Sequence, residues 1–226
     1  MIPSAHVDTF TRDNLPPAPD WPEFSFTLPE LRYPDRFNCA VELLDRWLER
    51  GHGERPSIIS PQETWTYAAL AKRVNRIANV LTRDLGLVPG NRVLLRGPNS
   101  PMMVATYFAV IKAGGVVVAT MPLLRAKELT YVATKAKIAL ALCDARLVDE
   151  MEKTKPQAPA LQRVVYWGGG TAAALEALMA KPGYENFTAC DTANDDVCLI
   201  AFTSGTTGEP KGTMHFHCDM LAICDS

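Results

Sequence analysis

The sequence predicts an α/β fold, in which a parallel sheet carries helices on both faces. Five short apolar segments alternate along the chain with segments whose apolar residues recur at helical spacing, and this alternation is typical of right-handed βαβ units. The composition agrees, because 47% of the 226 residues are hydrophobic and 21% are charged, close to the average for globular domains. The segments expected to be strands are 92–96, 116–120, 138–143, 163–167 and 197–202.

The start of the chain has less regular signals. Residues 1–36 are rich in proline and aromatic residues without a regular period, so we expect an arm that lies over the body. A first helix is expected after Asn38 and should end at Gly51. Short β segments are expected at 57–60 and directly before Thr66, which should cap a second helix. The apolar face of that helix contains Leu70, Val74, Ile77, Ala78, Leu81 and Leu85.

Beyond residue 90 the element boundaries are clearer. Ser100 followed by Pro101 marks the start of a helix that should reach about Lys112. Residues 102–124 are long enough to cross a bilayer, but Lys112 near their centre and Gly114 after it indicate a buried helix, a glycine stop and a buried strand. Further helices are expected at 126–135, 145–153 and 171–180.

Three regions follow from this pattern. Residues 1–36 form the extended arm, and residues 37–196 form the α/β body. Residues 197–226 are expected to form a strand–loop–strand unit that begins a second subdomain, interrupted at 226.

Charge and cysteine content narrow the class of protein. The chain has 23 basic and 25 acidic residues, so it has no global electrostatic reason to bind nucleic acid or an anionic membrane. Its six cysteines contain no C-x-x-C pair, and its first residues do not resemble a secretory signal. We therefore expect a cytoplasmic protein with reduced thiols and no membrane span.

The segment that carries chemistry follows the last expected strand directly. Residues 203–212, TSGTTGEPKG, contain three glycines, four hydroxyl side chains and one lysine. Glycines let backbone N–H groups turn toward an anion, hydroxyls donate hydrogen bonds, and Lys211 supplies a positive charge. Open α/β sheets bind ligands at the carboxyl ends of their strands, so this loop is expected to bind a polyphosphate. The expected phosphate-binding residues are Thr203, Ser204, Gly205, Thr206, Thr207, Gly208 and Lys211.

The competing interpretation of this segment is a flexible surface loop, because clusters of glycine, serine and threonine often form such loops. The spacing also differs from the common P-loop, in which Gly-Lys precedes serine or threonine, because here Pro210 precedes the lysine and Gly212 follows it.

The ten-residue segment resembles the phosphate-loop signature of the adenylate-forming superfamily, which includes acyl-CoA and aryl-CoA synthetases. Upstream, TWTYAAL at 64–70, GNRV at 90–93 and KAGG at 112–115 resemble further blocks of that family in the family's order. The resemblance covers about residues 40–226. The opening SAHVDTFTRDNLPP and the segment NCAVELLDRW are most similar to benzoate-type ligases, among them 2-aminobenzoate–CoA ligases.

This resemblance implies an ATP-dependent carboxylate–CoA ligase that uses ATP with Mg²⁺, and CoA as co-substrate. The carboxylate attacks the α-phosphate of ATP to give an acyl-adenylate and pyrophosphate, and the CoA thiol then displaces AMP. The expected acid is aromatic, such as benzoate or 2-aminobenzoate. Residues 203–211 would hold the β- and γ-phosphates, with Lys211 offsetting their charge.

The resemblance also implies missing parts, because family members are more than twice as long. We expect an amino-terminal portion of the large domain that lacks the later adenine-binding and ribose-binding segments and the mobile C-terminal domain. Such a portion should lack turnover, and it should either self-associate through exposed apolar surface or be only marginally stable. The catalytic residues therefore stay unassigned, and no metal ligand is assigned.

Three alternatives stay open. His215, His217 and Cys218 could bind zinc, although two histidines two residues apart on a strand should face one way and Cys218 the other. The chain could instead be a non-catalytic nucleotide- or protein-binding module that retains the fold. A phosphotransferase is disfavoured, because the sequence contains neither a Walker pattern nor a kinase His-Arg-Asp segment.

Overall fold

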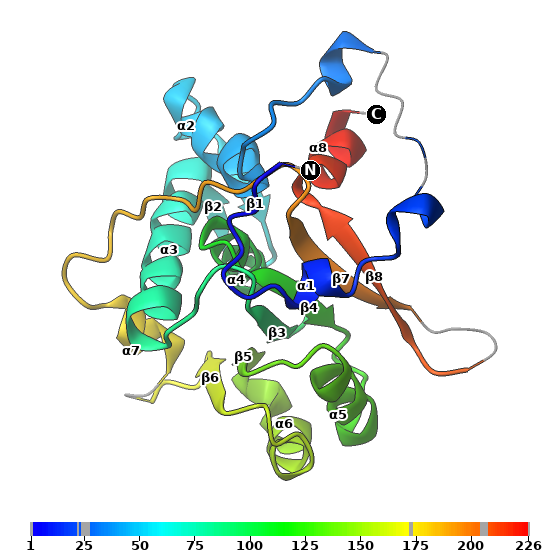
Figure 1. Cartoon of the computed structure of the whole chain (residues 1–226). Helices are drawn as coiled ribbons and strands as arrows, with labels where there is room; N and C mark the ends of the chain where they lie inside the picture. Colours follow the sequence, from blue (N-terminus) through cyan, green and yellow to red (C-terminus); the bar gives the residue numbers. More distant parts are fainter. Residues whose placement is uncertain (1, 22, 24–27, 172–173, 204–207, 226) are drawn as a thin grey trace.

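The computed structural model describes residues 2–21, 23, 28–171, 174–203 and 208–225. Its centre is a six-stranded sheet with the strand order β6-β5-β3-β4-β7-β8 (Figure 1). Four of the strands are β3 (Arg92–Arg96), β4 (Val116–Thr120), β5 (Leu140–Asp144) and β6 (Arg163–Trp167). The hairpin strands β7 (Val197–Thr203) and β8 (Lys211–Phe216) complete the sheet at one edge. The predicted α/β fold is confirmed.

One pairing departs from a purely parallel sheet. The five strands β3 to β7 are parallel to their neighbours, but β8 runs antiparallel to β7. The physical reason is the short connection, because a few residues can join antiparallel neighbours whereas a parallel pair needs a long crossover. Strands β7 and β8 belong to the same sheet as the strands of the body. The subdomain boundary expected at 196/197 stays a prediction.

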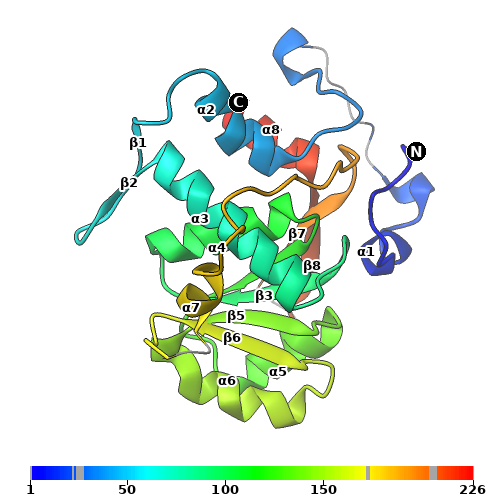
Figure 2. The same cartoon turned by 90° about the vertical axis from the view of Figure 1, so that its left-hand side faces the viewer.

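Helices cover both faces of the sheet, as predicted (Figure 2). One face carries α3 (Tyr67–Asn79), α4 (Pro101–Lys112) and α7 (Leu175–Met179). The other carries α5 (Ala126–Lys135) and α6 (Val148–Thr154). Both sides of the sheet are therefore buried, which explains why its strands read as continuous apolar runs.

Several element boundaries differ from the prediction for local reasons. The first helix contains a wide turn at Val41–Asp45 before α2 (Arg46–Glu49). The segment expected to be one helix from 145 starts with a 3₁₀ turn, because the Asp144 carboxylate accepts a hydrogen bond from the Arg146 N–H. The helix expected at 171–180 is only five residues long, α7, and residues 172–173 lie outside the described part.

The remaining elements flank the sheet. Strands β1 (Pro56–Ile59) and β2 (Thr64–Thr66) form a separate antiparallel pair, and α8 (His217–Asp225) follows β8. The arm contains the short helix α1 (Phe10–Asp13), and its Asp8 carboxylate lies 2.6 Å from the Arg92 guanidinium at the start of β3. The arm is thus attached to the body by a specific ion pair.

The apolar stretch 102–124 is a buried helix followed by a buried strand, as predicted: it forms α4 and β4. Among the described residues, no helix has the length and apolar character that a bilayer crossing requires.

Candidate functional site

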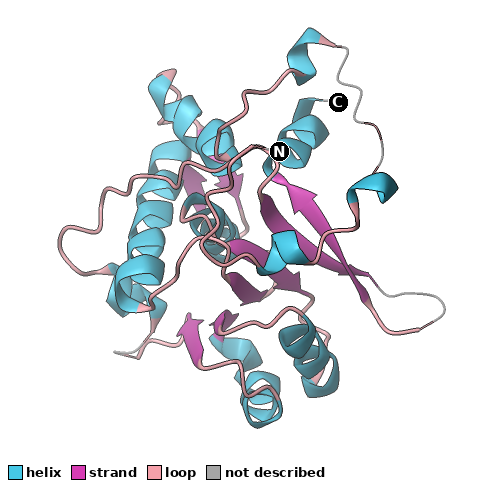
Figure 3. Ribbon diagram, viewed as in Figure 1, coloured by secondary structure: helices cyan, strands magenta, loops and turns pink. Residues whose placement is uncertain are grey.

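The sequence that was expected to bind phosphate joins β7 to β8. The two strands pair from Val197↔Phe216 to Thr203↔Lys211, so the hairpin closes on the last residue of β7 and the first of β8 (Figure 3). Val197, Cys198 and Ile200 in the first half of β7 are buried, whereas Thr203 is exposed. Strand β7 therefore leads directly from the core to the loop.

Three of the seven predicted phosphate-binding residues lie in the described part. Thr203 and Lys211 face each other across the hairpin, and the Thr203 Oγ1 lies 3.5 Å from the Lys211 carbonyl oxygen to which it donates. Both residues and Gly208 are exposed. The other four, Ser204, Gly205, Thr206 and Thr207, lie outside the described residues, so their assignment stays a prediction.

The described residues of this hairpin are chemically suited to a polyphosphate. Among the side chains that the structure places, no carboxylate lies within ion-pair distance of the Lys211 ammonium. Its charge is therefore not already offset by an ion pair with a described acid. An exposed hydroxyl and an exposed ammonium on opposite strands could approach one anion from two sides.

A residue that the sequence did not single out anchors the hairpin. The Tyr131 hydroxyl on α5 donates a hydrogen bond to the Pro210 carbonyl oxygen at 3.0 Å, and its ring meets Phe202 edge-on at 6.4 Å. Desolvation and the negative charge of Glu209 raise the pKa of Tyr131. Tyr131 sits in an ordinary amphipathic helix, so no local pattern marks it.

Close packing also fixes the end of the hairpin. A Cβ at Gly212 would lie 2.9 Å from the Ile200 Cγ2 across the strand pair, closer than real contacts allow. The third glycine of the motif thus has a packing role in addition to any role toward a ligand.

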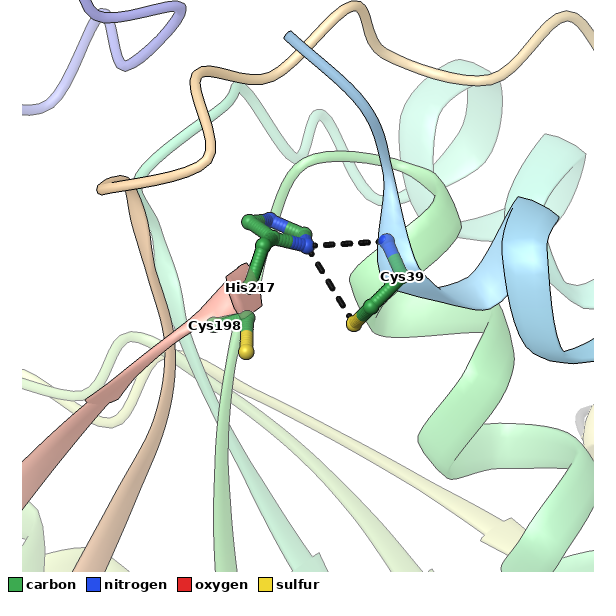
Figure 4. A group of neighbouring side chains, drawn as sticks. All are labelled: Cys39, Cys198 and His217. Atoms are coloured by element: carbon green, nitrogen blue, oxygen red, sulfur yellow. Dashed lines mark hydrogen bonds between the residues drawn. The ribbon is translucent and has the colours of Figure 1, made fainter. Parts of the chain in front are cut away.

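The expected orientation of the histidine pair was wrong. His215 lies on β8, but the strand ends at Phe216 and His217 is the first residue of α8, so the two histidines do not share a strand. His217 is buried and lies next to Cys39 and Cys198 (Figure 4). Within the described residues, His215 and Cys218 belong to no metal-ligand group.

The amino-acid sequence matches a known protein family and several of its members. The family model described as "AMP-binding enzyme" matches residues 44–226. Benzoate–CoA ligase of Thauera aromatica is 35% identical over 199 residues, which cover 88% of this chain and 38% of the relative. The 3-hydroxybenzoate–CoA/4-hydroxybenzoate–CoA ligase of the same organism is 31% identical, over 85% of this chain and 37% of the relative.

Solved structures have the same fold. An anthranilate CoA ligase in complex with anthranoyl-AMP superposes with a TM-score of 0.82 at 23% identity, over 88% of this chain and 38% of that one. ATP-bound MatB from Rhodopseudomonas palustris superposes with a TM-score of 0.72 at 29% identity, over 83% of this chain and 37% of that one. The chain thus spans less than two fifths of the length of these relatives.

Proposed function

The chain belongs to the AMP-binding enzyme family, and from that premise we propose that it is the amino-terminal part of an ATP-dependent carboxylate–CoA ligase. The overall reaction converts an acid, ATP and CoA into acyl-CoA, AMP and pyrophosphate through an acyl-adenylate. The observation that carries the proposal is the exposed pair of Thr203 and Lys211 at the end of a buried strand, on either side of the TSGTTGEPKG loop.

In this proposal the hairpin holds the β- and γ-phosphates of ATP. The Lys211 ammonium offsets negative charge on the phosphate oxygens, and the Thr203 hydroxyl turns from the Lys211 carbonyl oxygen to donate to one of them. Ser204, Gly205, Thr206, Thr207 and Gly208 supply further hydroxyl and backbone N–H donors. Mg²⁺, when present with ATP, would supply additional charge neutralisation, and no residue of this chain is assigned as its ligand. Fixed donors stabilise the pyrophosphate as it leaves the α-phosphorus.

We further propose that the acid is aromatic, of the benzoate or 2-aminobenzoate type. Both curated relatives described above are named for benzoate or hydroxybenzoates, and their matches cover at least 85% of this chain. The acid-binding pocket itself is not assigned to residues here. Support for the substrate therefore comes from overall similarity and not from the lining of a pocket.

Turnover is proposed to need more than these 226 residues. The relatives that match this chain are more than twice as long, so most of their residues have no counterpart here. Self-association of the isolated chain and a cytoplasmic location also stay predictions.

Thioester formation tests the proposal. The complete open reading frame and the 226-residue chain are each incubated with ATP, Mg²⁺, CoA and one acid at a time: benzoate, 2-aminobenzoate, 4-hydroxybenzoate or palmitate. We expect the complete protein to form an aromatic acyl-CoA and the chain alone to form none. A clear preference for palmitate would contradict the aromatic substrate. No thioester with any acid, together with intact ATP binding, would favour the non-catalytic binding module.

A further inference from the structure

Three soft metal-ligand side chains meet in the core. Cys39 lies at the start of the first helix, Cys198 on β7 and His217 at the start of α8 (Figure 4). Their ligand atoms all lie within 4.8 Å of one another, and each residue is at most 1% exposed. We propose that Cys39, Cys198 and His217 bind one thiophilic d¹⁰ cation, Zn²⁺ or Cu⁺.

The donor set selects the class of ion. Two sulfurs and one imidazole nitrogen form the group, and no carboxylate belongs to it. Mg²⁺ and Ca²⁺ prefer oxygen ligands, whereas thiolates and imidazoles favour zinc and monovalent copper. A buried site made only of soft donors is therefore unsuited to the hard cations that accompany ATP.

The imidazole is in the form that a metal requires. The Nδ1 of His217 accepts a hydrogen bond from the Cys39 N–H at 3.1 Å and lies 3.2 Å from the Cys39 Sγ. A ring nitrogen that accepts an N–H bond carries a lone pair, so the ring is neutral and its lone pair faces Cys39. Binding of an ion would exchange that hydrogen bond for a coordinate bond.

Only small movements are needed to admit the ion. Bond lengths of about 2.3 Å to sulfur and 2.0 Å to nitrogen, at a tetrahedral angle, put the two ligand atoms about 3.5 Å apart. The observed 3.2 Å between the Cys39 Sγ and the His217 Nδ1 would open by a few tenths of an ångström. The side chains thus already stand close to a coordinating arrangement.

Charge also favours a cation. Metals bind the thiolate form of cysteine and not the thiol, so an ion held by Cys39 and Cys198 would displace the protons of their sulfurs and offset the negative charge that remains.

Neighbouring contacts hold the ligands in place before any ion arrives. The ring of Phe37 meets that of His217 edge-on at 6.4 Å, and the His217 N–H donates to the Asp196 carbonyl oxygen at 3.2 Å. Next to Cys39, the Asn38 side chain donates to the Ile111 carbonyl oxygen at 2.9 Å. Ligands fixed in this way lose little freedom on binding. Because the site is closed, the ion would enter as the chain folds.

The test is metal content and site-specific protection in the 226-residue chain. The protein is refolded without oxygen, under a phosphine reductant, with Zn²⁺ or Cu⁺ alone, and bound metal is measured by mass spectrometry after gel filtration. Variants Cys39→Ala, Cys198→Ala and His217→Ala are compared with Cys143→Ala, an equally buried cysteine in the other core cluster. Cobalt substitution of the wild type checks for a thiolate-to-metal charge-transfer band.

We expect one ion per chain in the wild type and in Cys143→Ala, and an affinity at least about a hundredfold lower in the three ligand variants. In the wild type the ion should also slow alkylation of Cys39 and Cys198 but not of the exposed Cys224, which tests the site even where a variant fails to fold. The proposal is overturned if the folded wild type retains no stoichiometric ion, or if alkylation of Cys39 and Cys198 is not slowed. It is equally overturned if the ligand variants keep the ion, or if the control Cys143→Ala loses as much of the ion as the ligand variants do. A disulfide between Cys39 and Cys198 under these reducing conditions would also overturn it.

Discussion

The ion pair of Lys112 joins elements on one face of the sheet, so replacing this lysine with methionine should destabilise the protein. The Lys112 side chain is 4% exposed, and its Nζ lies 2.6 Å from the Asp45 Oδ2. It also donates to the Asn75 Oδ1 on α3 at 2.8 Å. Methionine retains most of the side-chain volume but removes the charge and both polar contacts, leaving an acid and an amide without their partner.

The magnitude follows from the burial of each partner. Removing one member of a fully buried ion pair costs about 3–5 kcal/mol. The Asp45 side chain is 23% exposed, so water can solvate part of the remaining carboxylate. We therefore expect Lys112→Met to lower the free energy of unfolding by about 2–3 kcal/mol, and the Tm by about 4–12 °C for a chain of this size.

Urea unfolding followed by circular dichroism measures this loss. The matched control is Lys153→Met, because Lys153 is 62% exposed and pairs with Glu150 on the surface. An exposed pair of this kind contributes less than about 1 kcal/mol. If Lys112→Met were as stable as Lys153→Met, the argument from buried charge would be refuted.

Other predictions follow from single contacts. Gly114→Ala should cost about 2–3 kcal/mol in urea unfolding, because Gly114 has a φ of +78° and its Cβ would lie 2.7 Å from the Cys190 Sγ; a neutral effect would refute the packing argument. Ser100→Ala should cost about 1 kcal/mol through loss of the α4 N-cap, and Ser100→Asp should retain most of that stability. Burial of Asp196 acts to raise its pKa, but hydrogen bonds from Ser4 and from backbone N–H groups outweigh this effect and lower the pKa below its usual value. The stabilisation that Asp196 contributes is therefore present above about pH 4 and is lost as pH falls through the lowered pKa of the folded state. Melting curves between about pH 5 and pH 2 should therefore fall less steeply in Asp196→Asn than in the wild type.

Local signals were sufficient to predict the core strands and the starts of α3 and α4. The predicted caps are confirmed, since Thr66 and Ser100 accept hydrogen bonds from the N–H groups of Ala69 and Met103, each at 3.2 Å. Apolar runs identified the core strands because both faces of this sheet are buried. These features depend on neighbours within a few residues.

Features that depend on distant residues could not be predicted in the same way. Cys39 and Cys198 are separated by most of the chain, and only the fold brings them to His217. The contact of Tyr131 with Pro210 likewise joins α5 to the hairpin. The antiparallel pairing of β8 with β7 also could not be predicted, because hydrophobic periodicity does not show the direction in which a strand pairs.

Nucleotide binding by Lys211→Ala tests the central claim most directly. Lys211 is compared with Lys127, an exposed lysine on α5, each replaced by alanine in the complete protein. Affinities for ATP and for AMP are measured by calorimetry in the presence of Mg²⁺. Loss of one charge-assisted contact, about 1.5–3 kcal/mol, should weaken ATP binding about ten- to hundredfold in Lys211→Ala and leave AMP binding nearly unchanged. Lys127→Ala should bind both nucleotides as the wild type does. Equal, small effects of Lys211→Ala on ATP and AMP would contradict a role for this lysine in holding the β- and γ-phosphates.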